Sequence, residues 1–230
     1  GAGLNSAGGA ITLGGTATAG SADFSDGVYI NGGGSMVSTG AGTITITGAS
    51  SSTGTSCDGV TIEGSFSITS AAGAIDITGT SVSANASHGV QVVGTAALTT
   101  GSGDVALKGT GQTGVLVSGS VTTTASGGDV SINPPPVTGS VTIGGTVLAY
   151  GAVSIGNNAS GPVTINAPGA INSDSDNSGG EDLTILSSGA ISQATGSTID
   201  ANTGGAFIRS VSSTVSVTDV DSAGANQLAS

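Results

Sequence analysis

Hydrophobic residues alternate with other residues in a short phrase, Gly-x-hydrophobic-x-hydrophobic, that recurs along nearly the whole chain. Alternation with a period of two is typical of β-strands. The phrases form three interleaved series: a first at 9–13, 42–46, 73–77, 103–107 and 127–132; a second at 27–30, 59–62, 89–92, 114–117 and 139–143; and a third at 34–38, 64–68, 94–98, 119–123 and 145–149. The order of the three never changes over five rounds. Three strands per round predict an all-β fold, a parallel β-helix (β-solenoid) with three strands per coil.

The alternation also assigns side chains to the two faces of each strand. Inward positions in one round should be Ile44, Ile46, Val60, Ile62, Phe66 and Ile68. Inward positions stacked on them in the next round should be Ile75, Ile77, Val90, Val92 and Leu98. The polar β-branched residues between them should lie outside, in contact with water: Thr43, Thr45 and Thr61.

One connection in each round varies in length. Between the first and second strands of a round, long loops at 16–26, 49–58 and 80–88 give way to short ones at 110–113, 134–138 and 157–160. The long loops end in the similar phrases Ser-Asp-Gly-Val, Cys-Asp-Gly-Val and Ser-His-Gly-Val. Because coils stack in register, we expect the three long loops to form a ridge along one edge of the first half of the rod. Loops on one side of a solenoid are a common place for binding.

The pattern continues after residue 150, with hydrophobic phrases at 151–155, 161–165, 169–171, 182–185, 189–191, 197–199 and 205–208. We therefore predict a single solenoid domain over 1–210, with about seven to eight coils. At the usual strand spacing, the rod would be roughly 35 Å long. Residues 211–230 should form a last strand and a polar tail, or continue into a neighbouring coil or subunit.

Composition agrees with this architecture and excludes others. The chain has 43 Gly and only five Pro in 230 residues, with three Phe, two Tyr and no Trp. Glycine without a three-residue period excludes collagen, and the mean hydropathy of +0.32 with 7% charged residues is unlike a disordered chain. Many glycines together with β-branched residues are typical of short strands joined by tight turns.

The formal net charge of −12 arises from 14 acidic residues against Lys108 and Arg209. Such a surface repels nucleic-acid phosphates and anionic lipids, so we expect neither nucleic-acid binding nor a membrane-surface role. No stretch approaches the ~20 apolar residues of a membrane helix, which predicts no membrane insertion. The acidity suits solubility outside the cell, or calcium. Cys57 is the only cysteine, so no disulfide can form within the chain, and we interpret it as a small filler or an incidental exposed residue.

The phrases GTITITG (42–48), GAIDITG (73–79) and GDVALKG (103–109) resemble the repeats of filamentous-haemagglutinin-like adhesins and autotransporter passenger domains. The resemblance covers about residues 1–210 and concerns composition and period; the three-phrase rounds here are longer than the haemagglutinin pattern. It implies a right-handed β-helix secreted to, or displayed on, the surface of a Gram-negative bacterium.

The two ends of the sequence show no capping helix, initiator Met or signal peptide. A solenoid without caps leaves the backbone groups of its end strands unpaired. We therefore expect either a piece of a longer coil or rods that associate end to end.

Catalysis by a β-helix enzyme would require paired carboxylates across a groove, with aromatic or basic residues to hold a polysaccharide. Asp76, Asp104 and Asp129 recur beside the hydrophobic positions of the first series, and the last two should stack on neighbouring coils. Stacked outward acids are typical of a solvated face. His88, the only histidine, lies in a loop, where we expect contact with solvent. The sequence therefore predicts no enzyme.

One acidic stretch, 172–182, has oxygen-bearing side chains at alternate positions followed by glycines and further acids. Such spacing can wrap a hard cation, so calcium is a possible cofactor here, although the stretch lacks the twelve-residue EF-hand spacing. The candidate ligands are Asp174, Asp176, Glu181 and Asp182. The alternative is a polar loop between coils.

Three functional hypotheses follow. The first is a structural segment of a surface adhesin or of a self-assembling extracellular fibre. The second is an adhesin module that binds a host or matrix ligand through the ridge of loops 16–26, 49–58 and 80–88. The third, a polysaccharide-active enzyme, has the least support.

Overall fold

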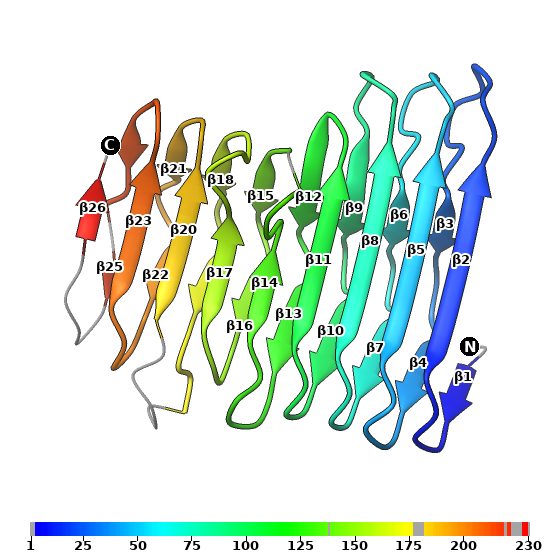
Figure 1. Ribbon diagram of the computed structural model, residues 1–230, viewed down its shortest axis with the longest axis horizontal. Helices are drawn as coiled ribbons and strands as arrows, with labels where there is room; N and C mark the ends of the chain where they lie inside the picture. The colour runs from blue at the N-terminus through cyan, green and yellow to red at the C-terminus, as the bar shows by residue number, and fades with distance from the viewer. Residues whose placement is uncertain (1–2, 138, 177–181, 219, 222–226, 230) are drawn as a thin grey trace.

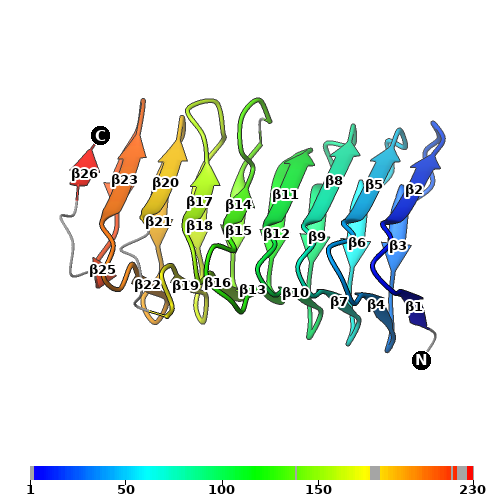
Figure 2. The same cartoon turned by 60° about the horizontal axis from the view of Figure 1, so that its bottom comes forward.

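The computed structural model describes residues 3–137, 139–176, 182–218, 220–221 and 227–229. In this part of the chain all regular structure is β, arranged as three parallel sheets that wind around one axis as a rod (Figure 1). The protein is thus a parallel β-solenoid of about eight coils with three strands per coil, as the pattern predicts. The two termini lie at opposite ends of the rod, and the view in Figure 2 shows the coils stacked side by side.

The first sheet, sheet A, contains the strands of the third series. Its order is β1 (Gly3–Ser6), β4 (Ser35–Ser38), β7 (Ser67–Ser70), β10 (Ala97–Thr100), β13 (Ser120–Thr123), β16 (Thr146–Leu148), β19 (Ala170–Asn172), β22 (Thr198–Asp200) and β25 (Val220–Asp221).

Sheet B contains the first series. Its order is β2 (Ile11–Ala17), β5 (Ile44–Ser50), β8 (Ile75–Ser81), β11 (Val105–Thr110), β14 (Val130–Ile132), β17 (Val153–Gly156), β20 (Leu183–Ser187), β23 (Ala206–Ser210) and β26 (Gln227–Ala229). Its first strands are the longest in the rod. Nine strands at the usual spacing make a rod roughly 38 Å long.

Sheet C contains the second series. Its order is β3 (Val28–Ile30), β6 (Val60–Ile62), β9 (His88–Val92), β12 (Thr113–Val117), β15 (Val141–Ile143), β18 (Val163–Ile165), β21 (Ile191–Gln193) and β24 (Val215–Ser216). No helix in the described residues is long and apolar enough to cross a membrane.

The hydrophobic core consists of side chains stacked in register from coil to coil. Ile44 pairs with Ile75 in sheet B, Val60 with Val90 in sheet C, and all four are fully buried. Burial of apolar surface stabilises by about 25 cal/mol per Å², so these columns are the main source of stability. The predicted inward residues are buried, except that Phe66 is only partly buried and packs at the edge of the core.

Two outward predictions are confirmed and one is wrong. Thr43 is exposed and Thr45 partly exposed, but Thr61 is buried with 3% of its surface accessible. Thr61 alternates with Val60 and Ile62, so it points away from the core. It is buried because the polar groups of the adjoining long loop cover this part of the outer face of sheet C. Alternation along a strand predicts direction, whereas a covering loop decides exposure.

The later coils keep the same sheets. The phrases predicted after residue 150 correspond to the successive strands β17 to β23. Within 211–230, β24, β25 and β26 add one further strand to sheets C, A and B respectively.

Candidate functional site

The three long loops form the predicted ridge, which rises beyond the ends of β2, β5 and β8 at one edge of the first coils (Figure 1). Sheets B and C come into direct backbone contact below it. A Cβ atom on Gly48 would lie 2.0 Å from the carbonyl oxygen of Gly59, and one on Gly59 would lie 2.2 Å from the amide nitrogen of Thr80. The same contact joins Gly79 to Gly89. Only glycine fits such an approach, so two facing columns of glycine separate the ridge from the main core.

Inside the ridge, small hydroxyl side chains take the place of hydrophobic ones. Ser50 donates to the carbonyl of Ser25 at 2.5 Å, and Ser81 repeats this bond one coil later with the carbonyl of Cys57. Ser83 donates to the carbonyl of Gly54 at 2.6 Å. Each hydroxyl satisfies a carbonyl that the loop leaves without a strand partner, which lets a polar loop pack in a dry interior. Cys57 is buried and occupies a serine position, in agreement with its interpretation as a filler.

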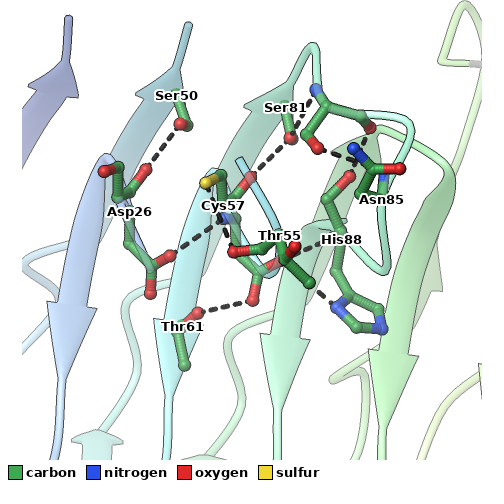
Figure 3. A network of polar contacts seen from close by, with 12 residues as sticks. Asp26, Ser50, Thr55, Cys57, Thr61, Ser81, Asn85 and His88 are labelled. Atoms are coloured by element: carbon green, nitrogen blue, oxygen red, sulfur yellow. Dashed lines mark hydrogen bonds and ion pairs between the residues drawn. The ribbon is translucent and has the colours of Figure 1, made fainter. Parts of the chain in front are cut away.

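A column of polar residues marks the point where the ridge returns to sheet C: Asp26, Asp58 and His88. Figure 3 shows the first and last of these, Asp26 and His88, within the surrounding network of polar contacts. The Asp26 carboxylate accepts the backbone N–H of Asp58 at 2.9 Å, and the Asp58 carboxylate accepts the backbone N–H of His88 at 2.6 Å. Asp58 also accepts the hydroxyl of Thr61 at 3.1 Å and lies 3.2 Å from Nδ1 of His88. Carboxylate side chains thus hold consecutive coils together at this corner.

Burial controls the protonation of the first member of this column. Desolvation, the largest influence, raises the pKa of the Asp26 carboxyl above its ordinary value. Hydrogen bonds from the Asp58 backbone and the Thr61 hydroxyl act in the opposite direction, and the charges of Asp58 and Glu63 add to the rise. The charges of two further carboxylates, Asp58 and Glu63, therefore act on Asp26 on this side of the rod.

A groove of about 990 Å³ lies between the ridge and the outer face of sheet C. Its lining includes three sets of equivalent positions from the first three coils. These sets are Phe24, Ser56 and Ala86; Asp26, Asp58 and His88; and Tyr29, Thr61 and Gln91. Small side chains from 16–20 and the carboxylate of Glu63 complete much of the remainder. Concave sites with a few convergent polar groups are where proteins commonly bind ligands.

Two aromatic residues of the groove are exposed. Phe24 is 79% exposed and Tyr29 56% exposed. The Tyr29 hydroxyl donates to the carboxylate of Glu63 and accepts from the Asn31 amide at 2.8 Å. The bond to Glu63 raises the pKa of the Tyr29 hydroxyl, because loss of its proton would place two negative oxygens together.

The groove was not predicted from the sequence, although the ridge beside it was. One pattern could have indicated it. Phe24 and Tyr29 are two of only five aromatic residues in the chain, and both lie in the first round. The positions equivalent to Phe24 in the next two rounds are Ser56 and Ala86. Aromatic residues placed where a repeat otherwise has small ones are typical of a local function.

The acids considered for catalysis have structural partners. Asp76 forms an ion pair with Lys108 at 2.7 Å. Asp104 accepts the N–H of Asp129 at 3.0 Å, and Asp129 accepts the N–H of Ala152 at 2.8 Å, so the two stack as predicted. In both pairs a carboxylate accepts a backbone N–H from the next coil, as Asp26 and Asp58 do beside the ridge. The expectation that His88 lies in a solvated loop is wrong: it is the first residue of β9, and only 18% of its side chain is exposed because Asp58 holds its ring.

The three candidate calcium ligands that the structure describes, Asp174, Asp176 and Asp182, do not form a metal-binding group. Asp174 is buried at a positive φ of 52° and accepts the hydroxyl of Thr203. Asp182 accepts the N–H of Gly205 at 3.0 Å, and Asp176 is partly exposed. Glu181 lies outside the described residues. Among those described, no group of three His, Cys, Asp or Glu residues is arranged to hold a metal, and calcium binding at 172–182 stays a prediction.

Comparison with known proteins finds no matching family model, no matching curated protein and no matching solved structure.

Proposed function

We propose that the chain is a structural β-solenoid segment of a bacterial surface adhesin or of a self-assembling extracellular fibre. The observation that carries the proposal is the continuity of three parallel ladders along the whole described rod. In the described residues β1, β2 and β3 each pair with a strand on one side only. Any of these ladders can be lengthened by another coil, either from the same chain or from a second copy.

The acidic surface charge supports an extracellular location for this rod. A net charge of −12 with two basic residues keeps rods soluble and apart along their sides. Association is then favoured at the ends, where backbone groups offer hydrogen bonds that do not depend on side-chain charge. The resemblance of the repeats to those of secreted adhesins agrees with this assignment.

Negative-stain electron microscopy of the purified chain tests the proposal, combined with light scattering over a concentration series. Self-assembly predicts unbranched filaments one rod wide, whose mean length increases with protein concentration. A monomer of unchanged mass at the highest concentration would contradict the fibre. The rod as a segment of a longer chain would then be tested by expressing it with its natural neighbours and measuring whether they extend the same ladders.

A second candidate function is ligand binding at the groove beside the ridge. The specific observation in its favour is the exposure of Phe24 and Tyr29 in a concave site of about 990 Å³. The test is binding of the immobilised chain to a panel of matrix glycans and proteins. Phe24→Ala should reduce binding. Val82→Ala, which changes another exposed hydrophobic residue of the ridge but lies outside the groove lining, should not.

A further inference from the structure

The groove follows the rod axis, because its sets of equivalent residues come from consecutive coils. Phe24 donates its N–H to the carbonyl of Thr55, and Ser56 donates to that of Asn85, which places Phe24, Ser56 and Ala86 in register. Tyr29, Thr61 and Gln91 are in register within sheet C. The distance from the first coil to the third is two strand spacings, roughly 10 Å. A site with this shape suits an extended chain lying parallel to the rod.

The two aromatic rings lie at the first-coil end of this groove. Phe24 has a φ of 54°, a conformation that bulky residues rarely adopt. Ser56 and Ala86 have the same left-handed conformation in the next two coils, so the turn itself is a feature of the repeat. Only the first coil places an aromatic ring there. With Phe24 79% exposed, its ring adds little to the core, and it is available to a ligand.

The ring of Tyr29 is held in place before any ligand arrives. Its hydroxyl is bonded to both Glu63 and Asn31, and its 56% exposed side chain lies on the outer face of sheet C. An aromatic ring fixed in this way loses little conformational entropy on binding, which favours affinity. Its face presents apolar surface with a negative quadrupole, suited to the slightly positive C–H groups of a ligand.

The carboxylates of the groove are already engaged within the protein. Asp58 is 4% exposed and accepts bonds from Thr61 and from the backbone of His88. Asp26 accepts the N–H of Asp58, and Glu63 accepts the hydroxyl of Tyr29. A cationic ligand would have to compete with these bonds, and an anionic ligand would be repelled by all three charges. The site therefore favours an uncharged ligand.

Polar groups that remain available lie at the third-coil end. The Gln91 side-chain amide and Nε2 of His88 have no hydrogen-bond partner among the described residues. An amide supplies donors and an acceptor, and an imidazole nitrogen supplies one or the other. Both groups suit hydroxyls. A ligand with apolar faces and many hydroxyls along an extended chain is an oligosaccharide.

We propose that the groove binds an uncharged saccharide chain, with sugar rings packed on Tyr29 and Phe24 and hydroxyls bonded to Gln91 and His88. The proposal rests on the second candidate function, ligand binding at the groove, and names the class of ligand. Binding does not involve cleavage, because the groove's carboxylates hold the coils together and fix the Tyr29 ring.

The chain offers a convenient probe, since it has no Trp and only two tyrosines. In the variant Tyr150→Phe, Tyr29 is the sole tyrosine, and its emission reports on the groove. The variant is titrated with three uncharged probes, cellohexaose, maltohexaose and chitohexaose. At least one should produce a saturable change in emission, with an affinity in the micromolar to millimolar range typical of small concave sites, ~10⁻⁶ to 10⁻³ M.

Calorimetry with the best probe then compares variants of the groove. Tyr29→Ala and Phe24→Ala should each weaken binding about tenfold or more, and Gln91→Ala about threefold to tenfold. Tyr150→Ala is the matched control, because it removes the other tyrosine outside the groove lining, and it should bind like the original chain. Melting temperatures measured by circular dichroism establish that the exposed Phe24 and Tyr29 variants remain folded.

Charged probes separate the failure of this proposal from that of groove binding itself. Binding of hexagalacturonate in place of the uncharged probes, with loss in Phe24→Ala, would overturn the uncharged character of the ligand. Binding of hexalysine with the same loss would overturn the saccharide class. Either result would retain the groove as a site. Binding of no probe, or binding unchanged in Tyr29→Ala, would overturn the saccharide proposal. A hexasaccharide shortened during incubation would overturn binding without cleavage.

Discussion

The Asp58 carboxylate accepts the backbone N–H of His88 from the next coil at 2.6 Å, while Nδ1 of the same histidine lies 3.2 Å from the same oxygen. The contact closes a corner where the regular strand ladder is interrupted by the ridge loops. Asp26 makes the equivalent backbone contact with Asp58, and Asp104 with Asp129. Acidic residues at these corners therefore act as side-chain extensions of the ladder.

Removal of this carboxylate should destabilise the first three coils. Asp58→Ala would leave the partly buried N–H of His88 without its partner, at about 1–3 kcal/mol, while the Thr61 hydroxyl would keep its bond to Asp26. We expect the free energy of unfolding to fall by about 1–3 kcal/mol. Asp58→Asn keeps an acceptor for the His88 N–H and should lose less than half as much. Urea titration followed by circular dichroism measures both, and equal losses would contradict the assigned role.

The facing glycine columns make a sharper prediction. In Gly48→Ala the new methyl group would lie 2.0 Å from the carbonyl oxygen of Gly59, and movement of the nearby Val60 side chain could not relieve this clash with backbone. We expect a loss of about 3 kcal/mol or more, with the ridge displaced from sheet C. Gly14→Ala is the control, because the nearest atom there lies 3.9 Å away. Its melting temperature should equal that of the original chain.

The sequence predicts the main architecture well, because every coil of a solenoid repeats the same pattern of hydrophobic positions. Ile44 and Ile75 occupy the same place in successive phrases, so register follows from counting residues. Thr61 shows what residue spacing cannot predict. The direction of its side chain is predicted correctly, but its burial depends on the Asp58 side chain and the loop above it.

The groove could be predicted only in part. The phrases before Val28, Val60 and Val90 place Asp26, Asp58 and His88 in one column, and the loop lengths predict the ridge. The concave surface itself depends on how far the ridge leans over sheet C. That is decided by the contact between the two glycine columns, which involves residues from different strands and has no signature within one phrase.

The raised pKa of Asp26 predicts a dependence on pH. In its window, from the ordinary value of 3.8 up to the raised value, the folded state binds more protons than the unfolded state, so stability falls as pH increases. Asp26→Asn removes this loss and keeps an oxygen for the Asp58 N–H. The stability of the variant minus that of the original chain should therefore be larger at pH 7 than at pH 3. Melting temperatures of both proteins across this range supply the measurement, and a constant difference would contradict the prediction.

The contact between Tyr29 and Glu63 predicts an unusual tyrosine titration. In Tyr150→Phe only Tyr29 titrates among tyrosines, and its hydroxyl should ionise above the ordinary pKa of 10.0 because it donates a hydrogen bond to the Glu63 carboxylate. Glu63→Gln in the same background removes the negative charge and should lower the midpoint. Absorbance of the phenolate against pH gives both midpoints. Identical midpoints would mean that the bond does not persist in solution.

Assembly through the strand edges predicts a variant that folds but does not polymerise. Hydrogen bonds in a parallel pair involve alternate residues, and the Ile11 N–H donates to the carbonyl of Thr43, the residue before β5, so the N–H of Thr12 faces the open edge of β2. Thr12→Pro removes that N–H without breaking a bond to β5, as proline at a strand edge does. We expect a melting temperature close to the original and a critical concentration for filaments about tenfold higher, which corresponds to ~1.4 kcal/mol at each end contact. Thr12→Ala, which changes only the side chain, should assemble normally.

A second control is Thr45→Pro, at a position with strands on both sides. This variant should lose stability instead, because the N–H of Thr45 faces β2 within the ladder. Filaments that form equally well in Thr12→Pro would show that assembly does not proceed through this edge.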